Sequence, residues 1–379
     1  MSDYKQDFRR RADQAKAWMF DAAFPFWSDR ARHATGGFLE ALDLTGRPLA
    51  GESSRVRVQA RQTYCFALAM QLGWQTETAR AMCLFGINTL VNACRRADGL
   101  FGRLYAYEGA LLDPVADLYD SAFARLAFAT ALQAGLFEAR EPLLDITYAI
   151  EKHLRRQPAE EGYAETLPFP EDRNQNPHMH LYESALAHLA ADAGPEALQQ
   201  AYGLERLMAT RFIQSEKHIL RERFGPDWGP HAEDHVETGH HYEWVWLLHR
   251  RALLDKQAVH PDAHRLYAKA LQFTGADGQV WLKQSHDGDI LDSTQRSWGL
   301  TEAVKAHLVC WDAGHAPSAK HAIEAYDRLW HLHIEPAIEG GWLDAYDQTD
   351  TAISTHIPAS IGYHIFLAFA EWIRISGRI

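Results

Sequence analysis

The stretch from Glu237 to Arg250 reads Glu-Thr-Gly-His-His-Tyr-Glu-Trp-Val-Trp-Leu-Leu-His-Arg, and it joins a loop end to a long apolar helical pattern. Gly239 marks the end of the loop, and the pattern begins directly after it. His240 and Glu243 are three residues apart, so on a helix their side chains leave the same face. A carboxylate can fix the tautomer of an imidazole, and such a histidine suits proton transfer near neutral pH. The stretch therefore predicts a polar site at the mouth of a packed helix, although a local ion pair would leave the same pattern in a chain with 21 histidines.

The same helical periodicity recurs along almost the whole chain. Apolar residues at intervals of three and four predict about twelve helices, and the breaks between them carry Gly, Pro and Asp. The predicted helices span residues 4–24, 55–73, 76–95, 114–134, 138–156, 179–193, 196–214, 237–255, 260–273, 298–314, 317–332 and 358–376.

The twelve predicted helices form six antiparallel pairs. Such a structural repeat fits either an open solenoid or a closed barrel. A solenoid usually shows a sequence consensus at a fixed period. Here the connections vary widely in length and several are rich in aromatic residues, which favours a closed (α/α)6 barrel. Because no Pro/Ser-rich linker interrupts the pattern, we predict one all-α domain over residues 1–379, with a site at one end of the inner ring.

Composition narrows the classes of function. Hydrophobic residues make up 47% of the chain and 12 tryptophans are present, which is enough for a sizeable core. The net charge of −12 argues against nucleic-acid binding, and no run approaches the ~18–20 apolar residues of a membrane span. The polar N-terminus and four cysteines without a Cys-x-x-Cys pair predict a cytoplasmic protein with reduced thiols in its core.

Polar residues that are unusual for an apolar helix fall at the start of every second predicted helix. Arg57 and Arg61 are four residues apart, and an arginine this far into an apolar helix is costly unless it is paired or reaches solvent. His180 and Glu183 repeat the His–Glu spacing of the first stretch. If these helices form the inner ring, several histidines and no lysine meet at one end, which favours proton transfer over anion binding. The side chains expected there are Arg61, Tyr119, His180, Glu183, His240, Glu243, Trp298, Glu302 and His364.

A metal site is the competing interpretation of this histidine-rich chain. His231 and His235, and also His178 and His180, have ligand-like spacing. The first pair lies in a loop rich in Asp, Glu, Gly and Pro, and no His-Glu-x-x-His motif occurs. We therefore expect no catalytic metal. The chain also lacks a phosphate-binding loop, a dinucleotide fingerprint and a Gly-x-Ser-x-Gly elbow.

Five motifs in order resemble the N-acylglucosamine 2-epimerase family, and the similarity runs from Phe24 to Glu371. Each motif is weak alone, but their order makes the resemblance fairly specific. The resemblance implies an (α/α)6 barrel that acts on a monosaccharide, as a monomer or homodimer, with no obligatory metal or nicotinamide cofactor. The motifs are Val58-Gln-Ala-Arg-Gln62, Leu118-Tyr-Asp-Ser-Ala-Phe123, Asn176-Pro-His-Met-His-Leu-x-Glu183, Glu237-x-Gly-His-x-x-Glu-Trp244 and Pro358-Ala-Ser-x-x-Tyr-His364.

Within that family, the form Gly-His-His-Tyr-Glu-Trp resembles most the branch that isomerises mannose to fructose. Cellobiose epimerases of the family more typically carry an Asp where this chain has His241. Some sugar isomerases of the family also place an arginine in the loop just before this motif, and here that loop has none. Either His231 or His235 substitutes for it, or the contacts to the sugar differ.

Aldose–ketose isomerisation moves a proton between C2 and C1 through a cis-enediol, and it needs a base, an acid and a group that stabilises the enediolate. From the resemblance and the apolar surroundings, we predict His364 and His240 as the acid/base pair, with Glu243 orienting His240. Arg61 would stabilise the negative charge, and His356 replaces His364 if that residue is structural. The predicted substrate-binding residues are His180, Glu183, Asn176, Met179, Arg57, Tyr119, Asp120, Trp298 and Glu302.

Three other functions stay open at this point. A 2-epimerase would use the same residues and return the proton to the opposite face of C2. A glycoside hydrolase on the same barrel would need two carboxylates across the scissile bond, for which Asp120 and Glu302 are candidates. A non-catalytic carbohydrate-binding protein would exchange no proton with any sugar. A phosphorylated sugar would require a clustered basic site, which the sequence does not display.

Overall fold

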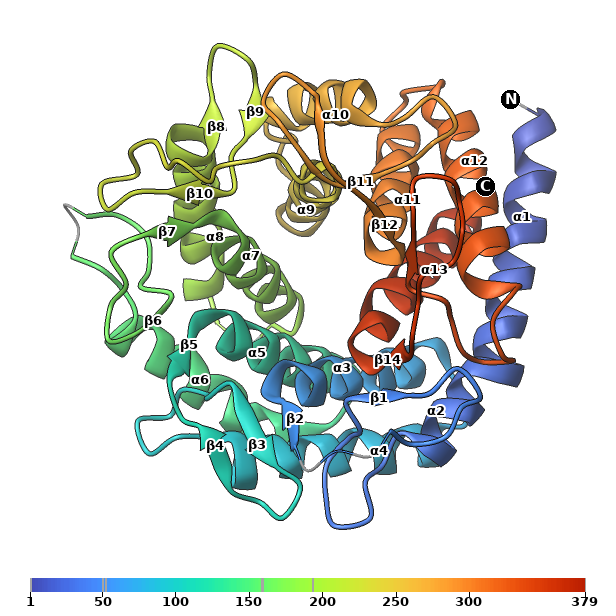
Figure 1. The fold of residues 1–379 in the computed structure, drawn as a ribbon. Helices are drawn as coiled ribbons and strands as arrows, with labels where there is room; N and C mark the ends of the chain where they lie inside the picture. The colour runs from blue at the N-terminus through green and yellow to red at the C-terminus, as the bar shows by residue number, and fades with distance from the viewer. Residues whose placement is uncertain (1, 50, 52, 158–159, 193, 379) are drawn as a thin grey trace.

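The computed structural model of the protein describes residues 2–49, 51, 53–157, 160–192 and 194–378. Within these ranges the helices surround a common centre, as Figure 1 shows, and each inner helix contacts the next until α13 returns to α3. This closed ring confirms the predicted (α/α)6 barrel. The inner helices are α3 (Val56–Leu72), α5 (Leu118–Gln133), α7 (Gln175–Ala190), α9 (Thr238–Asp255), α11 (Ser297–Asp312) and α13 (Gly362–Ser376).

The outer helices each pack against one inner helix, and α1 closes the ring by packing against α13. Their apolar residues recur at three- and four-residue intervals because only one face meets the inner ring, as Ala319, Ala322, Tyr326 and Leu329 show in α12. The outer elements are α1 (Ser2–Ala17), η1 (Trp18–Ala23), α2 (Phe24–Arg30), α4 (Thr76–Thr89), η2 (Leu90–Cys94), η3 (Phe137–Ala139), α6 (Arg140–His153), α8 (Glu196–Leu207), η4 (Met208–Phe212), α10 (Asp262–Phe273), α12 (Ser318–Leu329) and η5 (Trp330–Ile334).

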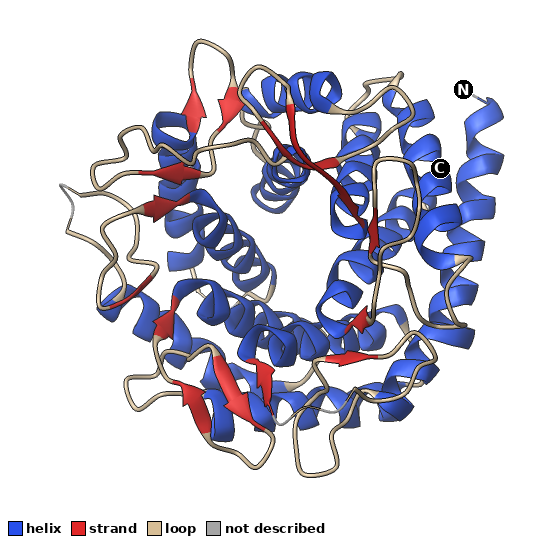
Figure 2. Cartoon of the chain, viewed as in Figure 1, coloured by secondary structure: helices blue, strands red, loops and turns tan. Residues whose placement is uncertain are grey.

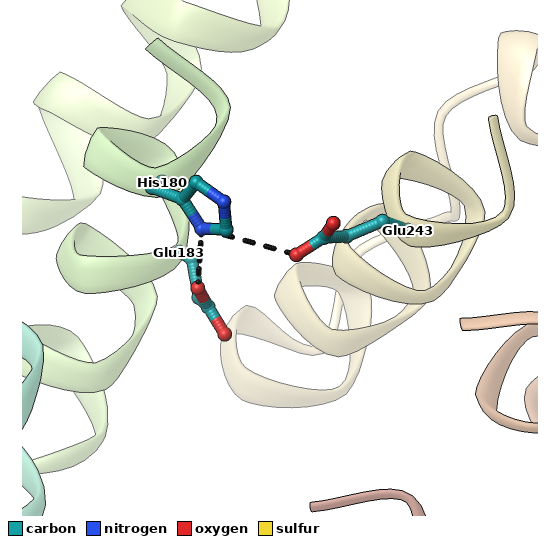
Figure 3. Close-up of side chains that lie close together, drawn as sticks. All are labelled: His180, Glu183 and Glu243. Carbon is teal, nitrogen blue, oxygen red and sulfur yellow. Dashed lines mark hydrogen bonds and ion pairs between the residues drawn. The ribbon is translucent and has the colours of Figure 1, made fainter. Parts of the chain in front are cut away.

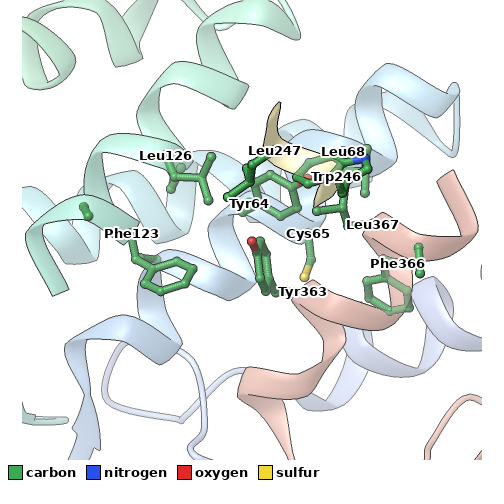
Figure 4. Close-up of a cluster of buried hydrophobic side chains, with 14 of the residues drawn as sticks. Tyr64, Cys65, Leu68, Phe123, Leu126, Trp246, Leu247, Tyr363, Phe366 and Leu367 are labelled. Carbon is green, nitrogen blue, oxygen red and sulfur yellow. The ribbon is translucent and has the colours of Figure 1, made fainter. Parts of the chain in front are cut away.

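The inner helices are buried on nearly all sides, because each lies between two inner neighbours, an outer helix and the barrel axis. In α9 every residue from Thr238 to His249 is buried. Apolar side chains from several inner helices meet within the ring, among them Tyr64 of α3, Leu247 of α9 and Leu367 of α13 (Figure 4). These side chains form part of the apolar packing inside the ring.

Short antiparallel strands, which the periodicity did not predict, lie in the connections on the face shown in Figure 2. Pieces of two to seven residues are mostly too short to leave an alternating pattern. Several of them lead directly into an inner helix, so strand pairing fixes where that helix begins. The strands are β1 (Ala41–Leu42), β2 (Ser53–Arg55), β3 (Leu104–Ala106), β4 (Leu111–Asp113), β5 (Ala116–Asp117), β6 (Thr166–Leu167), β7 (Arg173–Asn174), β8 (Ile213–Gln214), β9 (Ile219–Leu220), β10 (Arg223–Phe224), β11 (Trp281–Gln284), β12 (Ile290–Arg296), β13 (Ala345–Tyr346) and β14 (Ile357–Pro358).

Three predicted helix bounds were wrong for this reason, among them that of the helix over 358–376, because Pro358 belongs to β14 and α13 begins only at Gly362. The helix predicted over 114–134 begins only at Leu118, because the preceding residues pair as β4 and β5. Asp117 caps this helix, and its Oδ1 accepts hydrogen bonds from the backbone N–H groups of Tyr119 (2.9 Å) and Asp120 (3.2 Å). The helix predicted over 179–193 begins four residues earlier, directly after β7.

The burial of the cysteines and the length of the helices bear on two further predictions from the sequence. All four cysteines are buried in helical segments, as expected for core thiols: Cys65, Cys83, Cys94 and Cys310. Among the described helices, none has both the length and the apolar character needed to cross a membrane. The terminal residues 1 and 379 of the predicted domain lie outside the described residues.

Candidate active site

A pocket of about 500 Å³ lies at the N-terminal ends of the inner helices, and all six of these helices contribute to its lining. Such a shared pocket is typical of ligand sites between the helices of a bundle. Most of the predicted site residues line it: Arg57, Arg61, Tyr119, Asn176, His180, His240, Glu243, Trp298 and His364. His356, the predicted alternative to His364, also lines the pocket, from the loop between β13 and β14.

Four predicted substrate-binding residues lie behind this lining in the described structure: Asp120, Met179, Glu183 and Glu302. Asp120 binds Arg57, with 3.0 Å between Oδ2 and Nη2, and its Oδ1 accepts the backbone N–H of Arg57 at 2.7 Å. The geometry therefore gives these four residues no direct contact with the pocket, and the three carboxylates act on neighbouring side chains.

His240 is held by a carboxylate that the sequence did not predict. Its Nδ1 lies 3.0 Å from Oε1 of Glu222 and 3.7 Å from Oε2 of Glu237. Gln175 donates a hydrogen bond to Oε2 of Glu222 at 2.8 Å and so fixes that carboxylate. Burial alone would lower the pKa of His240, but Glu222 and Glu237 together raise it to about 10. His240 is therefore an imidazolium at neutral pH and can donate a proton from Nε2.

The prediction that Glu243 orients His240 was wrong, because Glu222 occupies that position. Glu222 lies in the loop just before β10, 18 residues before His240, so no helical spacing could connect the two. Glu243 instead points from α9 toward His180 on α7, as Figure 3 shows. Burial raises the pKa of Glu243 well above its ordinary value, and the nearby charge of Glu302 adds to the shift.

His364 lies in the opposite electrostatic environment. Its Nδ1 is 2.9 Å from Oε1 of Glu302, a residue 62 positions earlier on α11. Burial lowers the pKa of His364 well below its ordinary value, and the positive charges of Arg61 and Lys305 lower it further. The ring is therefore neutral. Because the Glu302 carboxylate accepts a hydrogen bond from Nδ1–H, the lone pair is on Nε2, which makes this nitrogen a base.

His180 and Glu183 form the pair that their spacing predicted. Nδ1 of His180 lies 3.0 Å from Oε2 of Glu183 and 3.8 Å from Oε1 of Glu243 (Figure 3). Burial lowers the pKa of His180 to about 4, so this ring is also neutral. Glu183 is further fixed by the hydroxyl of Tyr363, which donates a short hydrogen bond to Oε1. His180 therefore offers an unprotonated Nε2.

Arg61 is held mainly by aromatic rings. Its guanidinium carbon lies 4.2 Å from the ring centre of Phe123 and 5.2 Å from that of Tyr363, and Nη2 donates to the Tyr119 hydroxyl at 2.8 Å. Among the described residues no carboxylate forms an ion pair with Arg61, whereas Asp120 neutralises Arg57. The charge of Arg61 is thus available to a negatively charged oxygen in the pocket.

Trp298 lines the pocket beside both His240 and His364. Its ring centre lies 5.0 Å from that of His240 and 6.2 Å from that of His364. Gly239 makes this position possible, because a Cβ atom there would lie only 2.3 Å from the Trp298 ring. The sequence placed Gly239 at the end of a loop, but it is the second residue of α9 and its role is close packing.

Two groups of side chains in the described structure could hold a metal ion by distance alone: His180 with Glu183 and Glu243, and His240 with Glu222 and Glu237. Of the histidines whose spacing resembled metal ligands, His180 belongs to one of these groups in the described structure, whereas His178, His231 and His235 belong to neither. His178 accepts a hydrogen bond from the backbone N–H of Tyr163, and His235 binds Glu237. Neither His231 nor His235 is part of the pocket lining in the described ranges.

Comparison with known proteins gives concordant matches over nearly the whole chain. The family described as N-acylglucosamine 2-epimerase (GlcNAc 2-epimerase) matches residues 36–368. A mannose-6-phosphate isomerase of Rhizobium meliloti (strain 1021) is 31% identical, over 96% of this chain and 97% of the relative. A D-mannose isomerase of Thermobifida fusca is 26% identical, over 90% and 95%. The structure of a cellobiose 2-epimerase from Spirochaeta thermophila DSM 6192 superposes with a TM-score of 0.89 at 20% identity, over 98% of both chains, and shares the fold.

Proposed function

The chain belongs to the N-acylglucosamine 2-epimerase family, and on that premise we propose that it interconverts an aldose and a ketose, in the manner of D-mannose to D-fructose. One observation carries this proposal. Two buried histidines line the same pocket in opposite protonation states, because the pKa of His240 is raised to about 10 and that of His364 is lowered. Titratable groups whose pKa values are driven apart are the expected signature of an acid and a base that work together.

The first half of the proposed reaction forms the enediol. Nε2 of His364 takes the proton from C2 of the open-chain aldose, and the electrons of that C–H bond form the C1–C2 double bond. The carbonyl electrons move to O1, which receives a proton from Nε2 of His240. Arg61, whose charge is available to the pocket, stabilises the negative charge that develops on the oxygens.

The second half returns both protons and restores the starting state of the enzyme. The hydroxyl on C2 gives its proton to His240, and its electrons form the new C2 carbonyl. The double bond then takes a proton at C1 from His364. His180, whose Nδ1 is engaged by Glu183, accepts a hydrogen bond from a sugar hydroxyl at Nε2 and assists ring opening.

A 2-epimerase remains the second candidate, since the same two charge states serve it. In that reaction His240 would return a proton to the opposite face of C2. The experiment is to incubate the protein with D-mannose in D2O and to follow the products by NMR. Fructose as the main product supports the isomerase, whereas glucose with deuterium at C2 would make the protein a 2-epimerase. No exchange on mannose, N-acetylglucosamine or cellobiose would exclude the acid/base proposal and leave carbohydrate binding without catalysis.

A hexose 6-phosphate is the second candidate substrate. The sequence displayed no clustered basic site, but the pocket lining contains Arg55, Arg57 and Arg296 in addition to Arg61. Phosphate prefers the planar fork of arginine. Each of the first three arginines forms an ion pair with a carboxylate, of Glu40, Asp120 and Asp344 respectively, which orients its guanidinium but reduces its free charge.

The ratio of kcat/KM for mannose and mannose 6-phosphate tests this candidate. If the phosphate contacts Arg296, the substitution Arg296→Gln lowers kcat/KM for mannose 6-phosphate by about tenfold or more and leaves mannose nearly unaffected. Equal losses on both sugars would assign Arg296 to the common part of the substrate. We also infer that the protein acts in the cytoplasm as a monomer or homodimer, and light scattering of the purified protein measures the latter.

A further inference from the structure

Among the described residues one lysine is buried, and it lies on an inner helix of the barrel, behind the pocket lining. Lys305 on α11 is fully buried, and the lining of the described pocket does not include it. Its Nζ lies 2.6 Å from Oε2 of Glu302 and 4.2 Å from the ring centre of Trp246 on α9. The sequence patterns predicted no lysine among the site residues, and Lys305 has no role in the reaction proposed above.

The surroundings of Lys305 are rich in acidic side chains. Glu302 of α11, Glu243 of α9 and Glu183 of α7 all act on the lysine. Burial alone would lower the pKa of Lys305, but these three carboxylates raise it, so the ammonium stays charged. A buried charge is tolerated only when it is paired, and here the ammonium lies among acidic side chains of three helices.

Lys305 and His364 bind the two oxygens of the same carboxylate. Nζ of Lys305 forms an ion pair with Oε2 of Glu302, and Oε1 accepts the Nδ1–H of His364 at 2.9 Å. We propose that Lys305 is a positioning residue of the reaction, which keeps Glu302 an ionised acceptor and thereby holds His364 in the tautomer with an unprotonated Nε2. The inference rests on the proposed function, because it assigns the base of that reaction to Nε2 of His364.

Loss of the Lys305 ammonium would leave Nε2 of His364 protonated, and this can happen in two ways. Burial raises the pKa of Glu302, and without Lys305 to oppose it the carboxyl would take up a proton. A carboxylic acid can donate to Nδ1, which moves the ring hydrogen to Nε2 and removes the base. If Glu302 stays ionised instead, His364 becomes protonated at a higher pH, because Lys305 is one of the charges that hold its pKa down.

The other charged groups that act on His364 fix the direction of this effect. Arg61 of α3 and a protonated His180 of α7 lower the pKa of His364, and Glu183 of α7 raises it. These groups are unchanged in a Lys305 variant. Removing one positive charge therefore moves the acid limb of the pH profile in one direction, toward higher pH.

The test is Lys305→Met, which keeps an unbranched apolar stem and removes the charge. We expect kcat to fall by about 10²–10⁴-fold, as for the loss of a general base. We expect the acid limb of the kcat profile to move up by at least about one pH unit, and KM to change little, because Lys305 does not reach the pocket. Lys320→Met is the matched control, since Lys320 is an exposed lysine on α12 that also pairs with a glutamate. A purely structural lysine would lower yield and melting temperature without moving the acid limb.

Nitrogen-15 NMR of the imidazole rings separates this inference from the proposed function, because it needs no substrate. The His364 signals are assigned by their loss in His364→Asn, and in Lys305→Met they should show a protonated Nε2. If Lys305→Met does not fold, the isosteric Glu302→Gln breaks the same connection, and Lys305→Arg should keep the wild-type tautomer. A wild-type tautomer and acid limb in folded Lys305→Met or Glu302→Gln would overturn the inference. A wild type that turns over no sugar would instead overturn the proposed function.

Discussion

His240 and His364 make nearly the same local contact and have opposite charge. Each is buried and presents Nδ1 to a glutamate oxygen, at 3.0 Å from Glu222 and 2.9 Å from Glu302. The pKa of His240 is nevertheless raised to about 10, and that of His364 falls well below its ordinary value. The hydrogen bond therefore does not decide which histidine is the acid.

The difference between the two pKa values comes from charged side chains that do not hydrogen-bond to the histidine itself. Around His240 a second carboxylate, that of Glu237, adds to the first. Around His364 burial lowers the pKa, the charges of Arg61 and Lys305 lower it further, and the carboxylate of Glu183 opposes them without reversing the shift. A histidine that shares its glutamate with a cation stays neutral, whereas one between two carboxylates holds its proton.

The two environments are also built differently. The Glu222 side depends on a loop that Asp234 organises, since Oδ1 of Asp234 accepts the backbone N–H groups of Glu222 (2.9 Å) and Arg223 (3.0 Å). The Glu302 side belongs to the helices of the inner ring. The proposed acid is thus fixed by a loop, and the proposed base by the barrel itself.

Removal of either histidine gives the largest expected effect. His364→Asn and His240→Asn should each lower kcat by about 10²–10⁴-fold while the protein stays folded, because each loses one proton-transfer group. The measurement is single-turnover conversion of mannose, with circular dichroism as the check on folding. His356→Asn is the matched control. If His356→Asn is inactive while His364→Asn stays active, then His356 is the base, and the contrast between His240 and His364 does not explain the reaction.

Substitution of Glu222 and substitution of Glu302 should affect opposite limbs of the pH profile. In Glu222→Gln the pKa of His240 falls from about 10 toward its ordinary value, so the alkaline limb of kcat/KM should move to lower pH by at least about one unit, a tenfold effect for each unit. Glu302→Gln should act only on the base and its acid limb. Both variants measured from pH 5 to pH 10 test this, and a shift of the same limb in both would show that the two histidines are not independent.

The same two pKa shifts should appear in folding stability. His240 binds its proton more tightly in the folded state, so its stabilising contribution is complete below its ordinary pKa near 6.5 and is lost as pH rises through about 10. His364 resists protonation in the folded state, so its contribution is complete above pH 6.5 and is lost as pH falls. Each slope is at most about 1.4 kcal/mol per pH unit.

Urea unfolding at several pH values measures these slopes. We expect His240→Asn to flatten the alkaline side of the stability curve, and His364→Asn to flatten the acidic side. Several other buried histidines also have lowered pKa values, among them His178 and His241, so the difference between variant and wild type is the informative quantity on the acidic side. Two curves that change on the same side would contradict the assigned charges.

The contrast between the two histidines also shows what the sequence could and could not predict. The (α/α)6 barrel and the His180–Glu183 pair were predictable, because helical periodicity and an i, i+3 spacing are local properties. Glu222 acts on His240 from a loop, and Glu302 meets His364 from another helix, so neither partner leaves a local pattern. Lys305 did leave a signal that was missed: it lies three residues after Glu302 on an otherwise apolar helix, where an unpaired lysine would be costly.

The smallest effect concerns Trp298, the wall that both histidines share. In Gly239→Ala the new Cβ would lie 2.3 Å from the Trp298 ring, so the indole must move from its place beside the two imidazoles. Overpacking of this kind costs about 1–3 kcal/mol of stability. Because Trp298 contacts the pocket and transfers no proton, KM for mannose should rise by severalfold while both limbs of the pH profile stay in place. Gly203→Ala on α8 is the matched control, since a Cβ there meets no atom within 4 Å. A shifted limb in Gly239→Ala would mean that Trp298 sets the histidine pKa values as well, so that the more distant charges alone would not account for the difference between His240 and His364.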